Sequence, residues 1–211
     1  MKILIKGGKV INEGKIEVLD ILIKDERIEK IAPQINENVN LEINAEGKLI
    51  FPGVIDDQVH FREPGLTHKG DLFTEPRAAV AGGITSFMEM PNTVPNATTI
   101  ELLEDKYKIA AQKSIANYSF FMGTTNNNLE ELKRVDPKNI CGIMGSSTGN
   151  MLVDDQKILE KIFSEIDLLI ATHCEVDPII KKNQAEIIAQ YGEDIDATWH
   201  WKIRSEEACY A

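Results

Sequence analysis

The first 51 residues of the chain alternate between apolar and polar positions in short runs, as half-buried β-strands do. Turn signals separate these runs, for example Asn12-Glu13-Gly14 and Glu46-Gly47. Residues 1–51 are therefore predicted to form the N-terminal part of a small antiparallel β domain of the sandwich type.

From residue 52 onward, short apolar runs alternate with stretches in which apolar residues recur at helical spacing. The predicted strands span residues 54–59, 84–90, 118–122, 140–144 and 168–173, and the predicted helices span residues 74–81, 100–113, 128–134, 155–166 and 177–191. Repeated β–α units with short connections predict a parallel sheet with helices packed outside it.

The number of these units leaves two architectures open. An eight-stranded TIM-type (β/α)8 barrel typically needs about 250 residues, and residues 52–211 supply about five of its strands. An incomplete barrel is the simplest interpretation of this α/β region. A complete, five-stranded, doubly wound sheet is the alternative.

The acidic composition changes which partners are expected. The chain of 211 residues has a formal net charge of -11 and no basic stripe, which argues against nucleic acid as a partner. No run approaches the roughly 18 consecutive apolar residues that cross a membrane, and the first residues lack a signal-peptide pattern. A cytoplasmic location is expected, and Cys141, Cys174 and Cys209 then fit reduced thiols. An anionic substrate would need a local cation.

The densest polar signal lies at the end of the predicted strand 54–59. Asp56, Gln58 and His60 share one face because strand side chains alternate, and Arg62 continues that face. At the carboxyl ends of barrel strands, such positions hold ligands and catalytic groups. A solvated strand end with a hydrogen-bonded His60 is the structural alternative.

Longer motifs, in a consistent order, resemble those of dihydroorotases, a family within the amidohydrolase superfamily. The matching segments are Phe51–Gly65, Ala81–Thr93, Gly145–Met151, Thr172–Glu175 and Ile203–Tyr210. Arg-Glu-Pro-Gly at 62–65 and Met-Pro-Asn-Thr at 90–93 are the segments that best separate dihydroorotases from other amidohydrolases. The resemblance implies an amidohydrolase barrel, of which this chain is the N-terminal portion.

The resemblance also implies roles for single residues. His60 and His173 match metal ligands, and imidazole suits Zn²⁺, of which the family holds one or two ions. Arg62 matches the residue that grips the substrate carboxylate through its planar fork, and Asn92 matches a substrate-binding asparagine. Glu175 is expected only to be a carboxylate at the start of a helix.

The activity that the resemblance implies is reversible hydrolysis of dihydroorotate to N-carbamoyl-aspartate in pyrimidine biosynthesis. In such an enzyme a metal-held hydroxide attacks the ring carbonyl, and an aspartate moves the proton to the leaving nitrogen. That aspartate belongs to a segment beyond residue 211, so no catalytic residue can be assigned here.

Three departures from the family pattern affect this interpretation. Gln58 stands where the first metal-binding histidine usually lies, and its neutral amide oxygen is at most a weaker ligand. No Lys or Asp lies between Ile140 and Gly145 to bridge two metals, and Lys138 comes too early. The chain also ends before the family's remaining ligand histidine. It is therefore expected to be an inactive fragment, with a homo-oligomer as a candidate assembly.

Two other functions remain open. The chain could be a non-catalytic dihydroorotase homologue that acts as a partner of aspartate carbamoyltransferase, which Gln58 and the shortened strand at 140–144 would favour. It could also be a cyclic amidohydrolase of the hydantoinase or allantoinase type. The hydantoinase or allantoinase hypothesis does not explain why an arginine, Arg62, stands in the motif Arg-Glu-Pro-Gly.

Overall fold

The computed structural model describes residues 1–145, 151–153 and 155–209 of the chain. It divides into two compact units, with the division between Val54 and Ile55. Within the described residues, no helix is both long and apolar enough to cross a membrane. Each unit is described by itself below.

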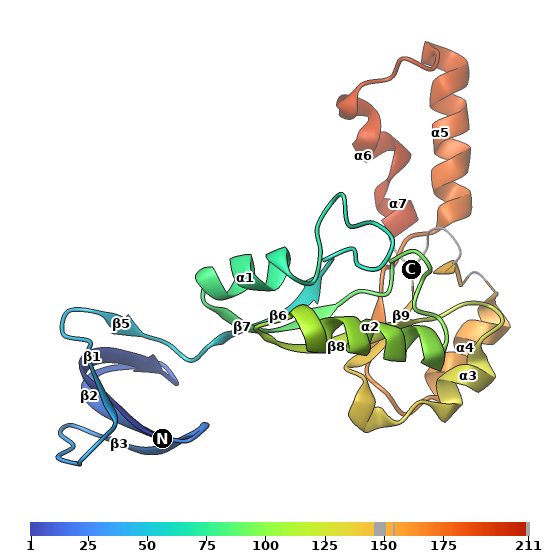
Figure 1. The fold of residues 1–211 in the computed structure, drawn as a ribbon. Helices are drawn as coiled ribbons and strands as arrows, with labels where there is room; N and C mark the ends of the chain where they lie inside the picture. Colours follow the sequence, from blue (N-terminus) through green and yellow to red (C-terminus); the bar gives the residue numbers. More distant parts are fainter. Residues whose placement is uncertain (146–150, 154, 210–211) are drawn as a thin grey trace. The chain divides into compact units, whose positions relative to one another are not determined.

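Unit 1, residues 1–54, is built around one five-stranded sheet (Figure 1). Its strands are β1 (Lys2–Asn12), β2 (Lys15–Lys24), β3 (Arg27–Ala32), β4 (Leu41–Asn44) and β5 (Leu49–Ile50). The order is β3-β2-β1-β4, and β5 also pairs with β1. β1, β2 and β3 pair antiparallel, as the turn signals between them predict, whereas β4 and β5 run parallel to β1. The sheet is therefore mixed, because residues 33–40 carry the chain past β1 before β4 begins.

A buried carboxylate ties this crossing segment to the sheet. Asp20 accepts a backbone N–H from Gly7 at 2.9 Å through one oxygen and from Ile35 at 2.9 Å through the other. Gly7 lies at the β-bulge of β1, where the ladder leaves donors unpaired. Ile35 packs with Leu4 and Leu22 in the small core of this unit.

Replacing Asp20 with Ala is expected to lower the free energy of unfolding of unit 1 by about 3 kcal/mol or more. The change leaves two N–H donors without their carboxylate acceptor, and each bond to a charged group contributes about 1.5–3 kcal/mol in general. Urea denaturation followed by circular dichroism measures the loss. Glu17→Ala, at an exposed position of the same strand, is the control, and equal stability of both variants would contradict the prediction.

Unit 2 contains the alternating strands and helices, and each predicted element is present within a few residues of its predicted bounds. The strands are β6 (Val54–Val59), β7 (Ile84–Glu89), β8 (Asn117–Gly123), β9 (Gly142–Gly145) and β10 (Ile170–Thr172). The helices are α1 (Thr74–Ala81), α2 (Ile100–Lys113), α3 (Leu129–Arg134), α4 (Gln156–Glu165), α5 (Asp177–Tyr191), α6 (His200–Ile203) and α7 (Glu206–Cys209), with short 3-10 turns at Pro137–Asn139 and Ala197–Trp199.

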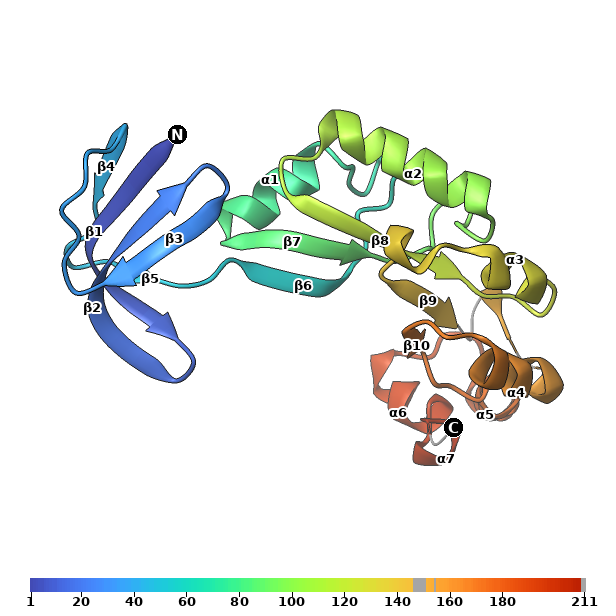
Figure 2. The ribbon, with the colours of Figure 1, turned by 90° about the horizontal axis from the view of Figure 1, so that it is seen from below.

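The sheet of unit 2 has the order β10-β9-β8-β7-β6, so neighbours in the sequence are neighbours in the sheet (Figure 2). β7, β8, β9 and β10 pair in parallel, as predicted. The strand order never reverses direction, as it does in a doubly wound sheet.

One face of this sheet is covered by helices. α1 and α2 lie on the same side of β7 and β8 (Figure 2). The main core mixes strand and helix side chains from that side: Phe87, Phe120, Met122 and Ile143 from the strands, and Leu103, Ala110, Leu132 and Ile162 from α2, α3 and α4. Helices on one face and an open opposite face are the arrangement of a barrel wall.

Candidate active site at the strand ends

The open face of the sheet ends in a hollow of about 590 Å³. From β6, Gln58 and Asp57 line the hollow, whereas Val59 is buried in the helix-covered core. His173, which follows β10, lines the same hollow. Two of the predicted site residues, distant in the sequence, are thereby brought to one cavity. Its apolar floor comes from Met88, Phe121, Met144 and Ala171.

His60 and Asn92 form a direct pair. The Nδ1 atom of His60 lies 2.8 Å from the Oδ1 atom of Asn92. Because an amide oxygen only accepts, this contact requires the proton on Nδ1, which in the neutral imidazole leaves the lone pair on Nε2. Asn92 therefore fixes the tautomer that leaves Nε2 free to bind an electrophile or a metal. The hydrogen-bonded histidine expected from the sequence alternative is found, and its partner is a predicted site residue.

His173 belongs to a different chain of contacts. Its Nε2 atom lies 3.1 Å from Oε2 of Glu175, and Oε1 of Glu175 accepts a bond of 2.7 Å from Nε of Arg204. The Arg204 bond, with a smaller effect of His173, lowers the pKa of Glu175. Glu175 lies directly before Val176, the N-cap residue of α5, which begins at Asp177. It connects His173 to the helices after β10.

Arg62 lies in the loop after β6 and has an unusual backbone. Its φ angle is 69°, in the left-handed region that non-glycine residues rarely adopt. Its N–H donates to Oε1 of Glu89 at 3.2 Å. Within the part of the chain that the structure describes, its guanidinium makes no ion pair. A fixed backbone with an unengaged guanidinium is suited to an anionic ligand.

Glu89 and Lys106 form a buried pair that the sequence analysis missed. Nζ of Lys106 lies 2.5 Å from Oε2 of Glu89 and donates to the carbonyl of Met90 at 3.0 Å. Burial raises the pKa of Glu89 and lowers the pKa of Lys106, and the attraction between the two opposes both shifts. The available signal was an acid between Met88 and Met90, near the end of a predicted strand.

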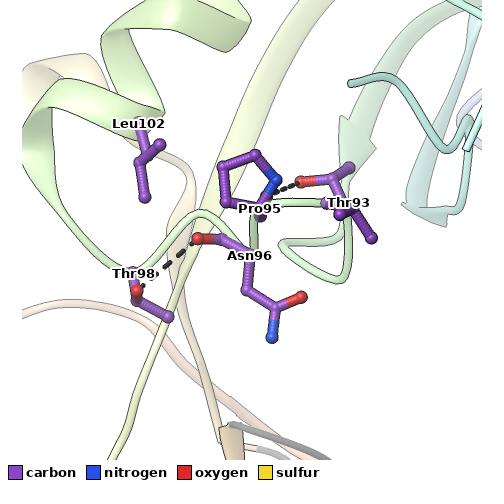
Figure 3. A pocket seen from close by; sticks show the side chains of 6 residues that line it. Thr93, Pro95, Asn96, Thr98 and Leu102 are labelled. Carbon is purple, nitrogen blue, oxygen red and sulfur yellow. Dashed lines mark hydrogen bonds between the residues drawn. The ribbon is translucent and has the colours of Figure 1, made fainter. Parts of the chain in front are cut away.

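The two motif loops lie against each other. The N–H of Val94 donates to the carbonyl of Pro64 at 3.0 Å, which joins the 62–65 loop to the segment after β7. In that segment the hydroxyl of Thr93 donates to the carbonyl of Pro95 at 2.8 Å (Figure 3). Thr93, Asn96, Thr98 and Leu102 border a second, smaller pocket of about 290 Å³ (Figure 3). The loop that carries Asn92 is therefore internally braced.

The candidate ligands are of types that bind metal ions, but they are fewer than a catalytic zinc site needs. His60 and His173 offer imidazole nitrogens, which suit Zn²⁺, and Gln58 offers an amide oxygen. A catalytic zinc site has three protein ligands. Among residues 1–145, 151–153 and 155–209, no three His, Cys, Asp or Glu side chains are grouped so as to hold a metal. The motif residues 146–150 and 210 lie outside the described residues.

Comparison with known proteins gives a consistent family. The sequence matches the family model described as dihydro-orotase-like over residues 47–194. It is 37% identical over 192 residues to a dihydroorotase of Carboxydothermus hydrogenoformans, covering 86% of this chain and 44% of the relative. It is also 32% identical over 214 residues to an allantoinase of Bacillus velezensis, covering 98% of this chain and 47% of the relative.

A solved structure agrees with the sequence relatives. The L-hydantoinase from Arthrobacter aurescens has a TM-score of 0.90 at 26% identity, covering 98% of this chain and 47% of that chain. The chain therefore spans less than half the length of these three proteins. The likeness and the one-sided helix layer confirm the predicted N-terminal part of a TIM-type barrel after a small β domain, against a complete doubly wound sheet.

Proposed function

This chain belongs to the dihydroorotase-like family of cyclic amidohydrolases, and we propose that it supplies part of the active site of a dihydroorotase. Such an enzyme hydrolyses the ring amide of dihydroorotate reversibly to N-carbamoyl-aspartate, a step of pyrimidine biosynthesis. A cytoplasmic location is part of the proposal, since Cys141, Cys174 and Cys209 are free thiols, as a reducing compartment favours.

The observation that carries this proposal is Arg62. Its backbone is held by Glu89, and its guanidinium makes no ion pair within the described residues. Dihydroorotate and N-carbamoyl-aspartate both carry a carboxylate, which a guanidinium binds through two parallel, charge-assisted hydrogen bonds. In a chain of net charge -11, a local cation is needed to attract such an anion.

We assign the other predicted residues to binding and orientation. Asn92 orients His60 through the 2.8 Å contact and is proposed to offer its amide nitrogen to the substrate. His60 and His173, with Gln58 as a weaker oxygen donor, are the proposed metal ligands, and Zn²⁺ is the metal that imidazole pairs suit. When bound, such a metal polarises the ring carbonyl and lowers the pKa of a water. No residue of this chain is assigned as the proton-transferring acid or base.

A hydantoinase or allantoinase activity is the second candidate. It is favoured by the TM-score of 0.90 with an L-hydantoinase and by the 32% identity to an allantoinase. The two candidate functions differ in whether substrate binding depends on the guanidinium of Arg62. Hydantoin itself bears no carboxylate, so binding of that ring would not depend on the guanidinium.

The test is binding of N-carbamoyl-L-aspartate and of hydantoin to the 211-residue chain, measured by titration calorimetry. Arg62→Lys keeps the charge but loses the planar fork, so we expect about tenfold or more weaker binding of N-carbamoyl-L-aspartate and unchanged binding of hydantoin. Arg134→Lys, at an exposed arginine on α3, is the matched control and is expected to change neither affinity.

Two outcomes would contradict the proposal. Preferential binding of hydantoin that Arg62→Lys leaves intact would favour the second candidate. Absence of N-carbamoyl-L-aspartate binding by the folded, unsubstituted chain would remove the proposed substrate site from these residues.

A further inference from the structure

Helix α2 presents two lysines to the loops that carry the motif residues. Lys106 and Lys113 are seven residues apart, which is close to two helical turns, so they share one face of α2. Lys106 pairs with Glu89 at the end of β7, and Lys113 pairs with Glu63 in the loop after β6. Both carboxylates are buried. The helix is therefore bonded to the segments on both sides of the strand ends.

These carboxylates hold the backbone on either side of Arg62. Glu89 accepts the N–H of Arg62 at 3.2 Å. Glu63, the next residue along the chain, accepts the N–H of Leu72 at 2.9 Å through the oxygen that does not face Lys113. The left-handed backbone of Arg62 is thus bonded directly to Glu89 and is followed by Glu63, whose side chain is held in turn, and each of these carboxyl groups faces a lysine of α2.

Lys106 also reaches the loop of the second motif residue. It donates to the carbonyl of Met90, two residues before Asn92, whose amide in turn orients His60. One ammonium therefore supports two paths: through Glu89 to Arg62, and through Met90 to Asn92 and His60. Both paths lead to residues of the candidate site.

Attachment of α2 to the sheet does not explain this arrangement. Leu103 and Ala110 of α2 are already buried in the main core. A buried ion pair is costly to desolvate, and apolar residues of similar volume often stabilise a fold as well or better. The pair does what apolar side chains cannot do, which is to supply a fixed acceptor and a fixed donor to two loop backbones.

We propose that Lys106 is a positioning residue, which acts through Glu89 on Arg62 and through the carbonyl of Met90 on Asn92 and His60. What Arg62 and Asn92 bind rests on the proposed function above. The positioning itself concerns only this chain's own atoms, so it can be measured without any ligand.

The test compares NMR spectra and amide hydrogen exchange of the ¹⁵N-labelled 211-residue chain with those of Lys106→Met and Glu89→Gln. We expect both variants to move the Arg62 amide resonance upfield and to speed its exchange by about tenfold or more, because a charge-assisted bond is lost or weakened. Lys106→Met is expected also to weaken the signature of the protonated Nδ1 of His60. Lys108→Met, an exposed lysine on the same helix, is the matched control.

The position of the change decides the outcome. Perturbation of residues 61–66 and 90–97 with β8 (Asn117–Gly123) unchanged supports positioning, whereas equal acceleration in β8 indicates a purely structural pair and overturns the proposal. The proposal is also overturned if the Arg62 and His60 signals of these variants change no more than they do in the control, Lys108→Met. If Lys106→Met does not fold, Glu89→Gln decides between the two outcomes. This variant removes the charge that pairs with Lys106, and its amide oxygen can still accept the N–H of Arg62. Ligand titration of the unsubstituted chain separately reports on the proposed function.

Discussion

Lys106→Met is expected to lower the free energy of unfolding of unit 2 by about 3–5 kcal/mol, the cost that follows when one partner of a buried ion pair is removed. Met fills much of the space of the lysine stem, so the loss comes from Glu89, which remains buried without its counter-charge. Chemical denaturation followed by circular dichroism measures the effect. Lys108→Met is expected to change stability by only about 0.5 kcal/mol, because its partner Asp105 is exposed.

The pH dependence of this deficit identifies its cause. Burial already raises the pKa of Glu89 above its usual 4.5, and removal of Lys106 removes the main opposing attraction. A carboxyl whose folded-state pKa is raised destabilises the fold as pH rises through that value and has no such effect below its unfolded value. The difference in stability between Lys106→Met and the unsubstituted chain should therefore shrink as pH falls toward 4.5. A deficit independent of pH would indicate a packing defect instead.

A second substitution provides a further check. Glu89→Gln in the Lys106→Met background removes the buried, unpaired charge of Glu89 and is expected to recover a large part of the lost stability. The Gln oxygen still accepts the N–H of Arg62, so the loop keeps an acceptor. If the double variant is no more stable than Lys106→Met, the charge of Glu89 is not the source of the loss.

The elements of unit 2 could be predicted well because their pattern is local. The predicted helix 100–113 has the observed bounds of α2, since its apolar spacing lies within the segment and its cap, Thr99, directly precedes it. The direction of β4 and β5 could not be predicted, because the pairing depends on the path of residues 33–40 across β1. Periodicity indicates a strand but says nothing about its partner.

The site divides in a similar way. Gln58, His60 and Arg62 could be singled out because a polar face ends an apolar strand. Their contacts could not: the partner of His60 is Asn92, on the next β–α unit, and the pairing of β6 with β7 in the folded sheet brings them within 2.8 Å.

The pairing of Glu89 with Lys106 could not be predicted for a further reason. Each lies in an element whose periodicity is otherwise that of a core strand or an amphipathic helix. A charged residue at such a position is normally assigned to the solvated face. Pairing between two of them is visible only once both elements are placed, so the support of the candidate site was less predictable than its contact residues.

Gly65→Ala is expected to destabilise unit 2 by about 3 kcal/mol or more. Gly65 has a φ angle of 85°, and an added Cβ would lie 2.0 Å from the carbonyl oxygen and 2.6 Å from the Cβ of Val94. The left-handed backbone costs a non-glycine residue about 1–2 kcal/mol, and relief of the clash costs about 1–3 kcal/mol more. Because Val94 also bonds to Pro64, relief must separate the loop of Arg62 from that of Asn92. Denaturation and hydrogen exchange of residues 90–97 measure both effects.

Gly83→Ala is the matched control for this prediction. Gly83 has a comparable φ angle of 91°, but nothing lies within 4 Å of its added Cβ, so the substitution carries the backbone strain alone. The difference in stability between the two variants therefore isolates the close approach of Gly65 to Val94. Gly65→Ala should also weaken the binding of N-carbamoyl-L-aspartate, which is proposed to need both Arg62 and Asn92, whereas Gly83→Ala should not. Equal losses of stability in the two variants would mean that the two motif loops do not rest on each other, and Arg62 and Asn92 would then have to be positioned independently.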